Sequence, residues 1–355
     1  MTARRVRVLV VDDSAIARDI IERGLSRHLE IEVVGKAADA FSARDKIVLL
    51  APDVVTLDVE MPKMDGIEFL KRLLPQYRMP VVVVSAVTSE GSLRALEALE
   101  AGAAAVVGKP QAGDKAGLET MLTDLADAVL EASKATMHAI PSRSSGRRRI
   151  VSKAGVLEGR IVVIGASTGG VAALNALVPT FPPDMPPTLV VQHMPKVFTR
   201  LFAEALGRNS RVRVKEAEHG DLLEPGLLVI GAGDFHLRIV KDGSRYRTKL
   251  DSAPKVSGHR PSVDVLFSSA AQEAGPRAVG FLMTGMGRDG AAGLLEMRRA
   301  GGRCIAQDEE SSVVFGMPKE AWETGAAERL VPLEDAGEAI LEILREPARE
   351  PTWRR

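Results

Sequence analysis

Residues 161–170 read Ile161-Val162-Val163-Ile164-Gly165-Ala166-Ser167-Thr168-Gly169-Gly170, a β-branched run that leads into a glycine-rich turn. A helical pattern follows this turn as far as Leu177. Further short apolar runs occur downstream, at Thr188–Gln192, Leu227–Ile230, Ala278–Met283 and Cys304–Ala306. Strands that alternate with helices form a parallel sheet covered by helices on both faces. The C-terminal half is therefore predicted to be an open, mainly parallel, doubly wound α/β domain.

A second series of this kind occupies the N-terminal part, with runs at Val6–Val11, Val33–Gly35, Val54–Leu57, Val81–Val84 and Ala105–Val107. Between the two series, residues 140–149 are polar and basic and contain few core-forming side chains. This composition is typical of a linker, although a basic run can also dock an acidic partner. We predict two doubly wound α/β domains, residues 4–126 and 157–348, joined by a flexible linker over 127–156.

Charge and cysteine content disfavour several classes of protein. The chain has 355 residues, with 47 Lys and Arg against 47 Asp and Glu, so it has no net charge to attract nucleic acid. Its single cysteine, Cys304, cannot form an internal disulfide, which fits a reducing compartment. Apolar runs are too short for a membrane-spanning helix or a signal peptide. We expect a cytoplasmic protein that neither binds nucleic acid nor inserts into a membrane, and a transcription factor is a remote alternative.

Polar side chains follow four of the N-terminal strands. Asp12 and Asp13 come after the first run, Asp58 after the third, Ser85 after the fourth and Lys109 after the fifth. The carboxyl ends of parallel strands meet at one edge, so these groups are expected to converge there. Three neighbouring carboxylates repel one another unless a cation binds, and oxygen ligands suit Mg²⁺. Single acids at strand ends often only cap helices, but capping does not account for all five positions.

From about Arg5 to Leu125 the sequence resembles the receiver domain of two-component response regulators, which has a flavodoxin-like fold. The resemblance implies that a histidine kinase is the phosphodonor, and that Ser85 and Lys109 respond to the phosphoryl group. It implies that Asp58 is the phospho-acceptor and that the Mg²⁺ ligands are Asp12, Asp13, Asp58 and the backbone carbonyl of Glu60. Val106 stands where receivers often carry a switch aromatic, so an aromatic rotamer cannot be coupled to Ser85 here.

The glycine-rich turn in the C-terminal half places Ser167 at the start of a helix, where backbone N–H groups favour a developing negative charge. A dinucleotide-binding turn requires Gly-x-Gly-x-x-Gly and an acid at the end of the next strand. Position 167 is a serine and the next strand ends in Gln192-His193, so we discount that interpretation. Gly-x-Ser-x-Gly also fits the α/β-hydrolase turn, whose partners follow in the order serine, acid, histidine.

His193, His236 and His259 are the candidate bases for Ser167. His193 directly follows the strand after the Ser167 strand, and neighbouring strands would bring its imidazole beside the hydroxyl. Asp289 lies in the loop after a later strand and is the expected partner that orients His193. The resulting order, serine, histidine, aspartate, differs from that of the α/β hydrolases.

From about Arg160 to Leu344 the sequence resembles the chemotaxis protein-glutamate methylesterases, which join a receiver to a Rossmann-like catalytic domain. The matching segments are Gly165–Gly170, Gln192–Pro195, His259–Phe267, Thr284–Gly290, Ala306–Glu309 and Val314–Pro318. The resemblance implies that Ser167 is the nucleophile, His193 the base and Asp289 its orienter, with the Met286 N–H as an oxyanion donor. One segment departs from the family, because Gly231-Ala232 stands where the family tends to show Ala-Pro.

The resemblance implies phosphorylation-regulated hydrolysis of glutamate methyl esters on chemoreceptors, together with deamidation of receptor glutamines. Hydrolysis by the serine is expected to need no cofactor, whereas phosphorylation of the receiver is expected to need Mg²⁺. The family arrangement also implies that an unphosphorylated receiver restricts access to the serine. The alternative is a receiver fused to a catalytically silent α/β module that binds a receptor, and the intact set of Ser167, His193 and Asp289 argues against it.

Overall fold

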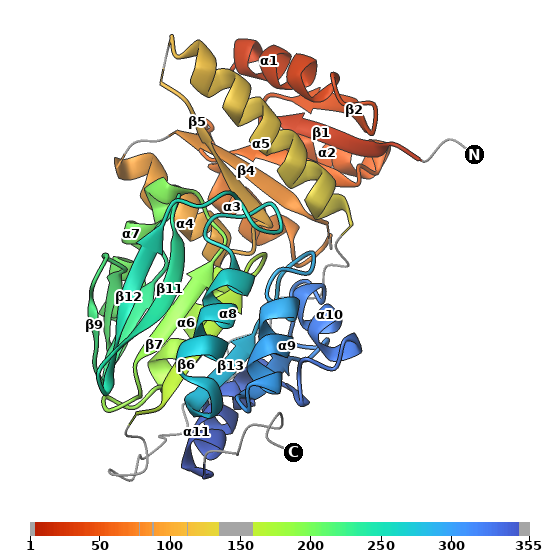
Figure 1. Ribbon diagram of the computed structural model, residues 1–355. Coiled ribbons are helices and arrows are strands. Elements are labelled where there is room, and N and C mark those ends of the chain that lie inside the picture. Colours follow the sequence, from red (N-terminus) through yellow and green to blue (C-terminus); the bar gives the residue numbers. More distant parts are fainter. Residues whose placement is uncertain (1–3, 78, 87–88, 112, 135–158, 348–355) are drawn as a thin grey trace. The chain divides into compact units, whose positions relative to one another are not determined.

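The computed structural model describes residues 4–77, 79–86, 89–111, 113–134 and 159–347 (Figure 1). The chain divides into two compact units, 1–139 and 140–355. Each unit is built on a parallel sheet, which confirms the predicted α/β class. Within the described residues, no helix is both long and apolar enough to cross a membrane.

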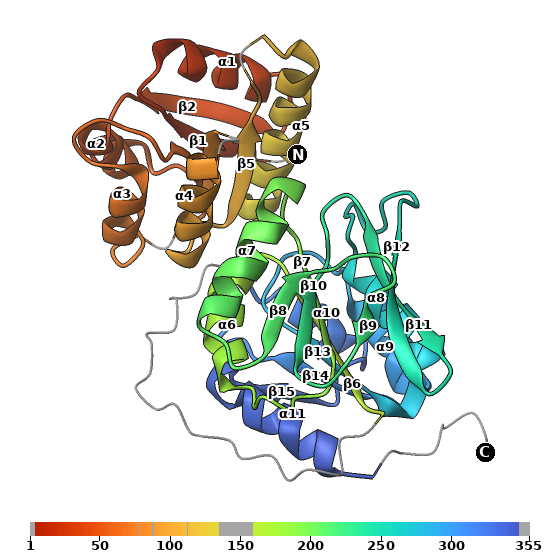
Figure 2. The same ribbon diagram turned by 90° about the vertical axis from the view of Figure 1, so that its left-hand side faces the viewer.

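The N-terminal unit contains a five-stranded parallel sheet in the order β2-β1-β3-β4-β5. This order is that of the flavodoxin-like fold. Helices α1 and α5 pack together on one face of the sheet, while α2, α3 and α4 lie on the other (Figure 2). The elements are β1 (Val6–Val11), α1 (Ala15–Leu25), β2 (Ile31–Ala37), α2 (Ala40–Leu50), β3 (Val54–Asp58), α3 (Gly66–Leu73), β4 (Val81–Ala86), α4 (Ser89–Glu100), β5 (Ala105–Lys109) and α5 (Lys115–Ser133).

Helix α5 extends further than the sequence predicts. The linker was expected to begin at residue 127, but the helix continues to Ser133. Val129 and Ala132 in this last part are buried in the cluster that also contains Leu25 of α1 and Val8 of β1. Burial of these apolar side chains favours the additional helical turns. Most of the remaining predicted linker lies outside the described residues.

The C-terminal unit contains a seven-stranded parallel sheet in the order β15-β14-β13-β6-β7-β10-β8. Its strands are β6 (Ile161–Ala166), β7 (Thr188–Gln192), β8 (Arg213–Glu216), β10 (Leu227–Ile230), β13 (Ala278–Leu282), β14 (Arg303–Gln307) and β15 (Arg329–Val331). The α-helices are α6 (Gly170–Leu177), α7 (Lys196–Arg208), α8 (Val263–Glu273), α9 (Ala291–Arg299), α10 (Met317–Glu323) and α11 (Ala336–Arg345). Three short 3₁₀ segments, Val178–Thr180, Gly275–Arg277 and Leu333–Asp335, also lie in the described part of this unit.

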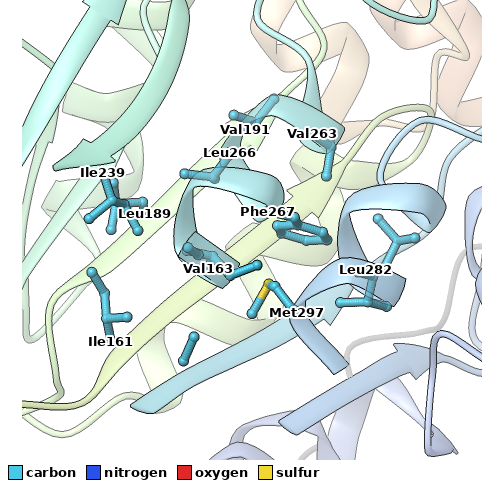
Figure 3. Close-up of a cluster of buried hydrophobic side chains, with 14 of the residues drawn as sticks. Ile161, Val163, Leu189, Val191, Ile239, Val263, Leu266, Phe267, Leu282 and Met297 are labelled. Carbon is cyan, nitrogen blue, oxygen red and sulfur yellow. The ribbon is translucent and has the colours of Figure 1, made fainter. Parts of the chain in front are cut away.

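The strand order reverses beside β6. From β6 the chain builds outward through β7 and later returns to place β13 on the opposite side of β6. Loops that leave such neighbouring strands in opposite directions open a crevice at the carboxyl edge, which is where ligands of open α/β sheets bind. Figure 3 shows the apolar cluster beneath this edge, in which Leu266 and Phe267 of α8 lie with Val163 of β6.

A three-stranded antiparallel sheet, in the order β11-β12-β9, was not predicted. It consists of β9 (Leu222–Leu223), β11 (His236–Asp242) and β12 (Arg245–Asp251). Buried residues such as Ile239 and Tyr246 alternate with exposed or half-buried charged ones, so the signal was present as a two-residue period. The short edge strands β8 and β15 are not predicted either, because β15 has only three residues and β8 has four, of which only Val214 is apolar.

Candidate functional site

Ser167 lies immediately after β6, at the carboxyl edge of the C-terminal sheet, and is buried. The chain turns at Gly169, which has φ +80° and caps the N-terminus of α6. A Cβ at Gly169 would lie 2.5 Å from the Cβ of Val313, so neither the backbone conformation nor the space accepts a side chain. Ser167 is therefore presented on a tight strand-to-helix turn, as its sequence context predicted.

Two neighbouring strands anchor this turn. The Ser167 N–H donates to the carbonyl of Thr284 over 3.0 Å, and the Thr284 hydroxyl donates to the carbonyl of Thr168 over 2.9 Å. From the other side, Nε2 of Gln192 donates to the carbonyl of Ser167 over 2.9 Å. Both residues of the Ser167–Thr168 peptide are thus held in place. Ser167 is held through its N–H and its carbonyl, and Thr168 through its carbonyl.

His193 directly follows β7, beside Ser167 at the same carboxyl edge of the sheet. Strands β6 and β7 pair in register Ala166 to Gln192, and the His193 N–H donates to the carbonyl of Ala166 over 3.1 Å. Nε2 of His193 lies 2.8 Å from Oδ2 of Asp289, whereas Nδ1 is buried and has no hydrogen-bond partner within the described residues. The histidine is therefore oriented through Nε2, and Nδ1 is the nitrogen left to accept a proton.

Asp289 is a buried carboxylate at the N-terminus of α8. Besides His193, it accepts hydrogen bonds from the Ser262 hydroxyl at 2.7 Å and from the N–H groups of Val263 at 2.8 Å and Asp264 at 3.0 Å. Burial by itself raises the pKa of Asp289, but the hydrogen bond and charge of His193 and the donors of α8 outweigh burial. The pKa lies well below its usual range, so the group is an anion at neutral pH.

Asp264 lies beside Asp289, and no hydrogen bond joins it to His193 within the described residues. Its Oδ1 accepts from the N–H groups of Gly290 at 2.9 Å and Gly293 at 2.8 Å, at the start of α9. Asp289 thus caps α8 while Asp264, in the first turn of α8, caps α9. Burial raises the pKa of Asp264 to about 6. The structure therefore gives Asp264 a helix-capping geometry rather than contact with the histidine.

The other two candidate histidines occupy different positions. The ring of His259 stacks on that of His193 with centroids 3.7 Å apart and planes inclined by 11°. Burial, followed by the charge of His193, lowers the pKa of His259 to about 3, which keeps the ring neutral. His236 is buried and accepts from the Ser262 N–H through Nδ1, while Nε2 donates to the carbonyl of Pro254. The sequence pattern indicated the segment of His259 but not this ring stacking.

Met286 lies in the loop after β13, one residue beyond Gly285. A Cβ on Gly285 would lie 2.8 Å from the Cβ of Ser167, so this loop passes directly beside the serine. The Met286 side chain is buried, and its backbone N–H makes no hydrogen bond within the described part of the chain. A free N–H beside a serine can stabilise an oxyanion.

A second cluster of polar groups lies in the N-terminal unit. Single carboxylate oxygens of Asp12, Asp13 and Asp58 lie within 4.8 Å of one another. Nζ of Lys109 donates to Asp12 at 2.9 Å and to Asp58 at 2.7 Å. The pKa of Asp58 is raised: burial is the largest cause, Lys109 opposes it, and the charge of the neighbouring Asp12 adds to it. The predicted strand-end acids and lysine are therefore together in the structure.

Ser85 and Glu60 take different positions around this cluster. The Ser85 hydroxyl donates to the carbonyl of Gly91 in α4 over 3.0 Å, and no hydrogen bond joins it to Asp58 within the described residues. Glu60 lies in the loop after β3, and its N–H donates to Oδ1 of Asp58 over 3.3 Å. Val106 of β5 is buried at 6% exposure.

Comparisons with known proteins identify a family for each of the two units. Residues 162–340 match the family described as CheB methylesterase, and residues 8–122 match the response regulator receiver domain. A protein-glutamate methylesterase/protein-glutamine glutaminase of Syntrophotalea carbinolica is 47% identical over 97% of this chain and 99% of that protein. One of Caulobacter vibrioides is 48% identical over 96% of this chain and 98% of that protein. The crystal structure of the Thermotoga maritima CheB methylesterase catalytic domain is 40% identical, covers 52% of this chain and 99% of that chain, and has a TM-score of 0.51.

Proposed function

The chain belongs to the CheB methylesterase family, and on that premise we propose that it hydrolyses methyl esters of glutamate side chains on chemoreceptors and deamidates receptor glutamines. We propose Ser167 as the nucleophile, His193 as the general base and Asp289 as the group that orients it. One observation carries this assignment: His193 is bound to buried Asp289 through Nε2, beside Ser167, with Nδ1 unpaired within the described residues.

The proposed reaction has two halves. Nδ1 of His193 removes the proton from the Ser167 hydroxyl as the oxygen attacks the ester carbonyl, and the imidazolium is stabilised by the Asp289 anion. The bond from the carbonyl carbon to the leaving group then breaks, C–O in an ester or C–N in an amide. The proton on Nδ1 goes to the departing oxygen or nitrogen, which leaves as methanol or ammonia. Water, deprotonated by Nδ1, then cleaves the acyl-enzyme to release the glutamate carboxylate and restore Ser167.

Backbone N–H groups are proposed to stabilise the tetrahedral intermediates. The N–H of Met286 lies on the loop that passes beside Ser167. The N–H of Thr168, the residue after the nucleophile, lies at the start of the turn into α6 and is the second proposed donor. Removal of one oxyanion donor typically costs about 10²- to 10³-fold in kcat.

We propose that phosphorylation of Asp58 by a chemotaxis histidine kinase regulates the esterase. Three carboxylates with one compensating Lys109 carry an excess of negative charge, and their oxygen donors suit Mg²⁺. Asp12, Asp13, Asp58 and the Glu60 carbonyl would hold the ion, which supplies charge neutralisation for the incoming phosphoryl group. Lys109 would then bind a phosphoryl oxygen, and Ser85 would exchange its bond to Gly91 for one to the phosphoryl group, which links the event to α4.

We also propose that the protein is cytoplasmic, because its single cysteine is buried and unpaired, which fits a reducing compartment.

The proposed activity and its regulation are tested by methanol release from methylated receptor membranes, with and without a small-molecule phosphodonor. We expect release by the full chain, stimulation by the phosphodonor, and a loss on the order of 10⁶ in kcat for Ser167→Ala. A fully active Ser167→Ala variant would remove Ser167 from the mechanism. Receptor binding without methanol release by the unmodified chain would favour the silent binding module.

A further inference from the structure

The side chain of Gln192 joins the two residues on which the proposed mechanism depends. Gln192 is the last residue of β7 and is buried at 3% exposure. Its Nε2 donates to the carbonyl of Ser167 over 2.9 Å and to the carbonyl of His193 over 3.1 Å. A carboxamide nitrogen carries two hydrogens, so both bonds are made at once. One amide group therefore ties the backbone of the nucleophile to the backbone of the base.

The bond to Ser167 also determines where the following N–H points. The Ser167 carbonyl accepts from Gln192 and, over 2.8 Å, from the N–H of Gly170. In a planar trans peptide the C=O and the next N–H point in opposite directions. Because the carbonyl is directed at the Gln192 amide, the N–H of Thr168 points away from that amide. An oxyanion donor must be held in place before the reaction, and the two hydrogen bonds to the Ser167 carbonyl hold this peptide plane.

The Gln192 amide packs closely against Gly170, where a side chain would not fit. A Cβ on Gly170 would lie 2.0 Å from Oε1 of Gln192 and 2.7 Å from the Cβ of Ala166. Reversal of the amide would bring Oε1 against two carbonyl oxygens, so Nε2 must face them. Oε1 then has no hydrogen-bond partner within the described residues, which is unfavourable for a buried acceptor. The hydrogen bonds of this carboxamide are therefore made through its nitrogen, to the backbone of Ser167 and His193.

We propose that Gln192 is a positioning residue for ester hydrolysis, which sets the placement of Ser167 relative to His193 and aims the Thr168 N–H at the oxyanion. This inference rests on the proposed function and adds to it a residue outside the serine, histidine and aspartate. Gln192 touches neither substrate nor proton in this scheme. It acts through the two carbonyl groups that it holds.

The test uses the full chain with Gln192→Met, which keeps the length of the side chain and removes both donors. The matched control is Thr188→Val, at the opposite end of the same strand, where the buried hydroxyl donates to the carbonyl of Pro186 over 2.9 Å. We expect Gln192→Met to lower kcat for methanol release by about 10- to 100-fold with KM within twofold, because misplacement of reacting groups by about 1 Å costs up to 10²-fold. Thr188→Val should keep kcat within about threefold of the unmodified chain.

Circular dichroism and the Tm separate positioning from folding. The inference is supported if the two variants have similar Tm and only Gln192→Met loses kcat, and it is overturned if their kcat values agree within about threefold.

If Gln192→Met does not fold, Gln192→Glu carries the test. A protonated carboxyl donates one hydrogen bond and a carboxylate none, so the kcat of this variant relative to the unmodified chain should fall as pH rises. Retention of full kcat by Gln192→Glu at every pH overturns the inference. Loss of activity in Ser167→Ala with full activity in Gln192→Met would reject this inference alone, whereas an active Ser167→Ala would reject the proposed function.

Discussion

Asp289→Asn should inactivate the esterase while the protein remains folded. Each oxygen of Asp289 accepts two hydrogen bonds: Oδ2 from His193 and the Val263 N–H, and Oδ1 from the Ser262 hydroxyl and the Asp264 N–H. An asparagine has only one acceptor oxygen, so either orientation turns its NH₂ group toward a backbone N–H of α8. Loss of that one acceptor should lower the free energy of unfolding by about 1 to 3 kcal/mol.

The catalytic loss should be much larger than the loss of stability. If the NH₂ group of Asn faces His193, Nε2 must accept and Nδ1 carries the proton, so Nδ1 cannot take a proton from Ser167. If the oxygen faces His193, the tautomer is kept, but the anion that stabilises the imidazolium is gone. By analogy with other triads, kcat should fall on the order of 10⁴-fold, which corresponds to about 5.4 kcal/mol of transition-state stabilisation.

The assay is the rate of methanol release from methylated receptor membranes at saturating substrate. Asp264→Asn is the matched control, because it neutralises a half-buried carboxylate of the neighbouring helix cap that makes no hydrogen bond to His193. Circular dichroism should show that both variants are folded. If Asp289→Asn retains more than about a tenth of kcat, Asp289 does not orient the base as argued.

Three further predictions concern the base, the receiver and pH. His193→Gln should abolish methanol release, whereas His259→Gln should reduce it less, since His259 only stacks on the His193 ring; the reverse order would transfer the role of base to His259. Asp58→Ala should remove stimulation by a small-molecule phosphodonor and leave basal release intact, and continued stimulation would place the phosphoryl group elsewhere. The raised pKa of Asp264 means that the folded state holds its proton to about pH 6, above the unfolded value of about 4. Stability of the unmodified chain relative to Asp264→Asn should therefore fall as pH rises from 4 through 6, as measured by urea unfolding, and a pH-independent difference would contradict that shift.

The elements that place the site follow closely from local sequence. Ile161–Ala166, with its β-branched residues and the glycine turn behind it, forms a strand that leads into a helix, as predicted. Likewise, the acids and the lysine after the N-terminal strands meet, because the carboxyl ends of parallel strands share one edge. The boundary of α5 and the hairpin of β11 and β12 were missed, because both depend on burial against distant elements as well as on local periodicity.

The sequence alone determined the fold class, the two α/β units and the residue types at each strand end, since these depend on periodicity and turn chemistry within a few residues. Only the tertiary structure decided how those residues are paired. The approach of His193 to Asp289 joins positions 96 residues apart, and the stacking of His259 on His193 comes from a loop remote in sequence. The two carbonyl groups held by Gln192 likewise come together only when β7 pairs with β6. Such contacts depend on which strands become neighbours and on the space between packed side chains, and neither is encoded in a local pattern.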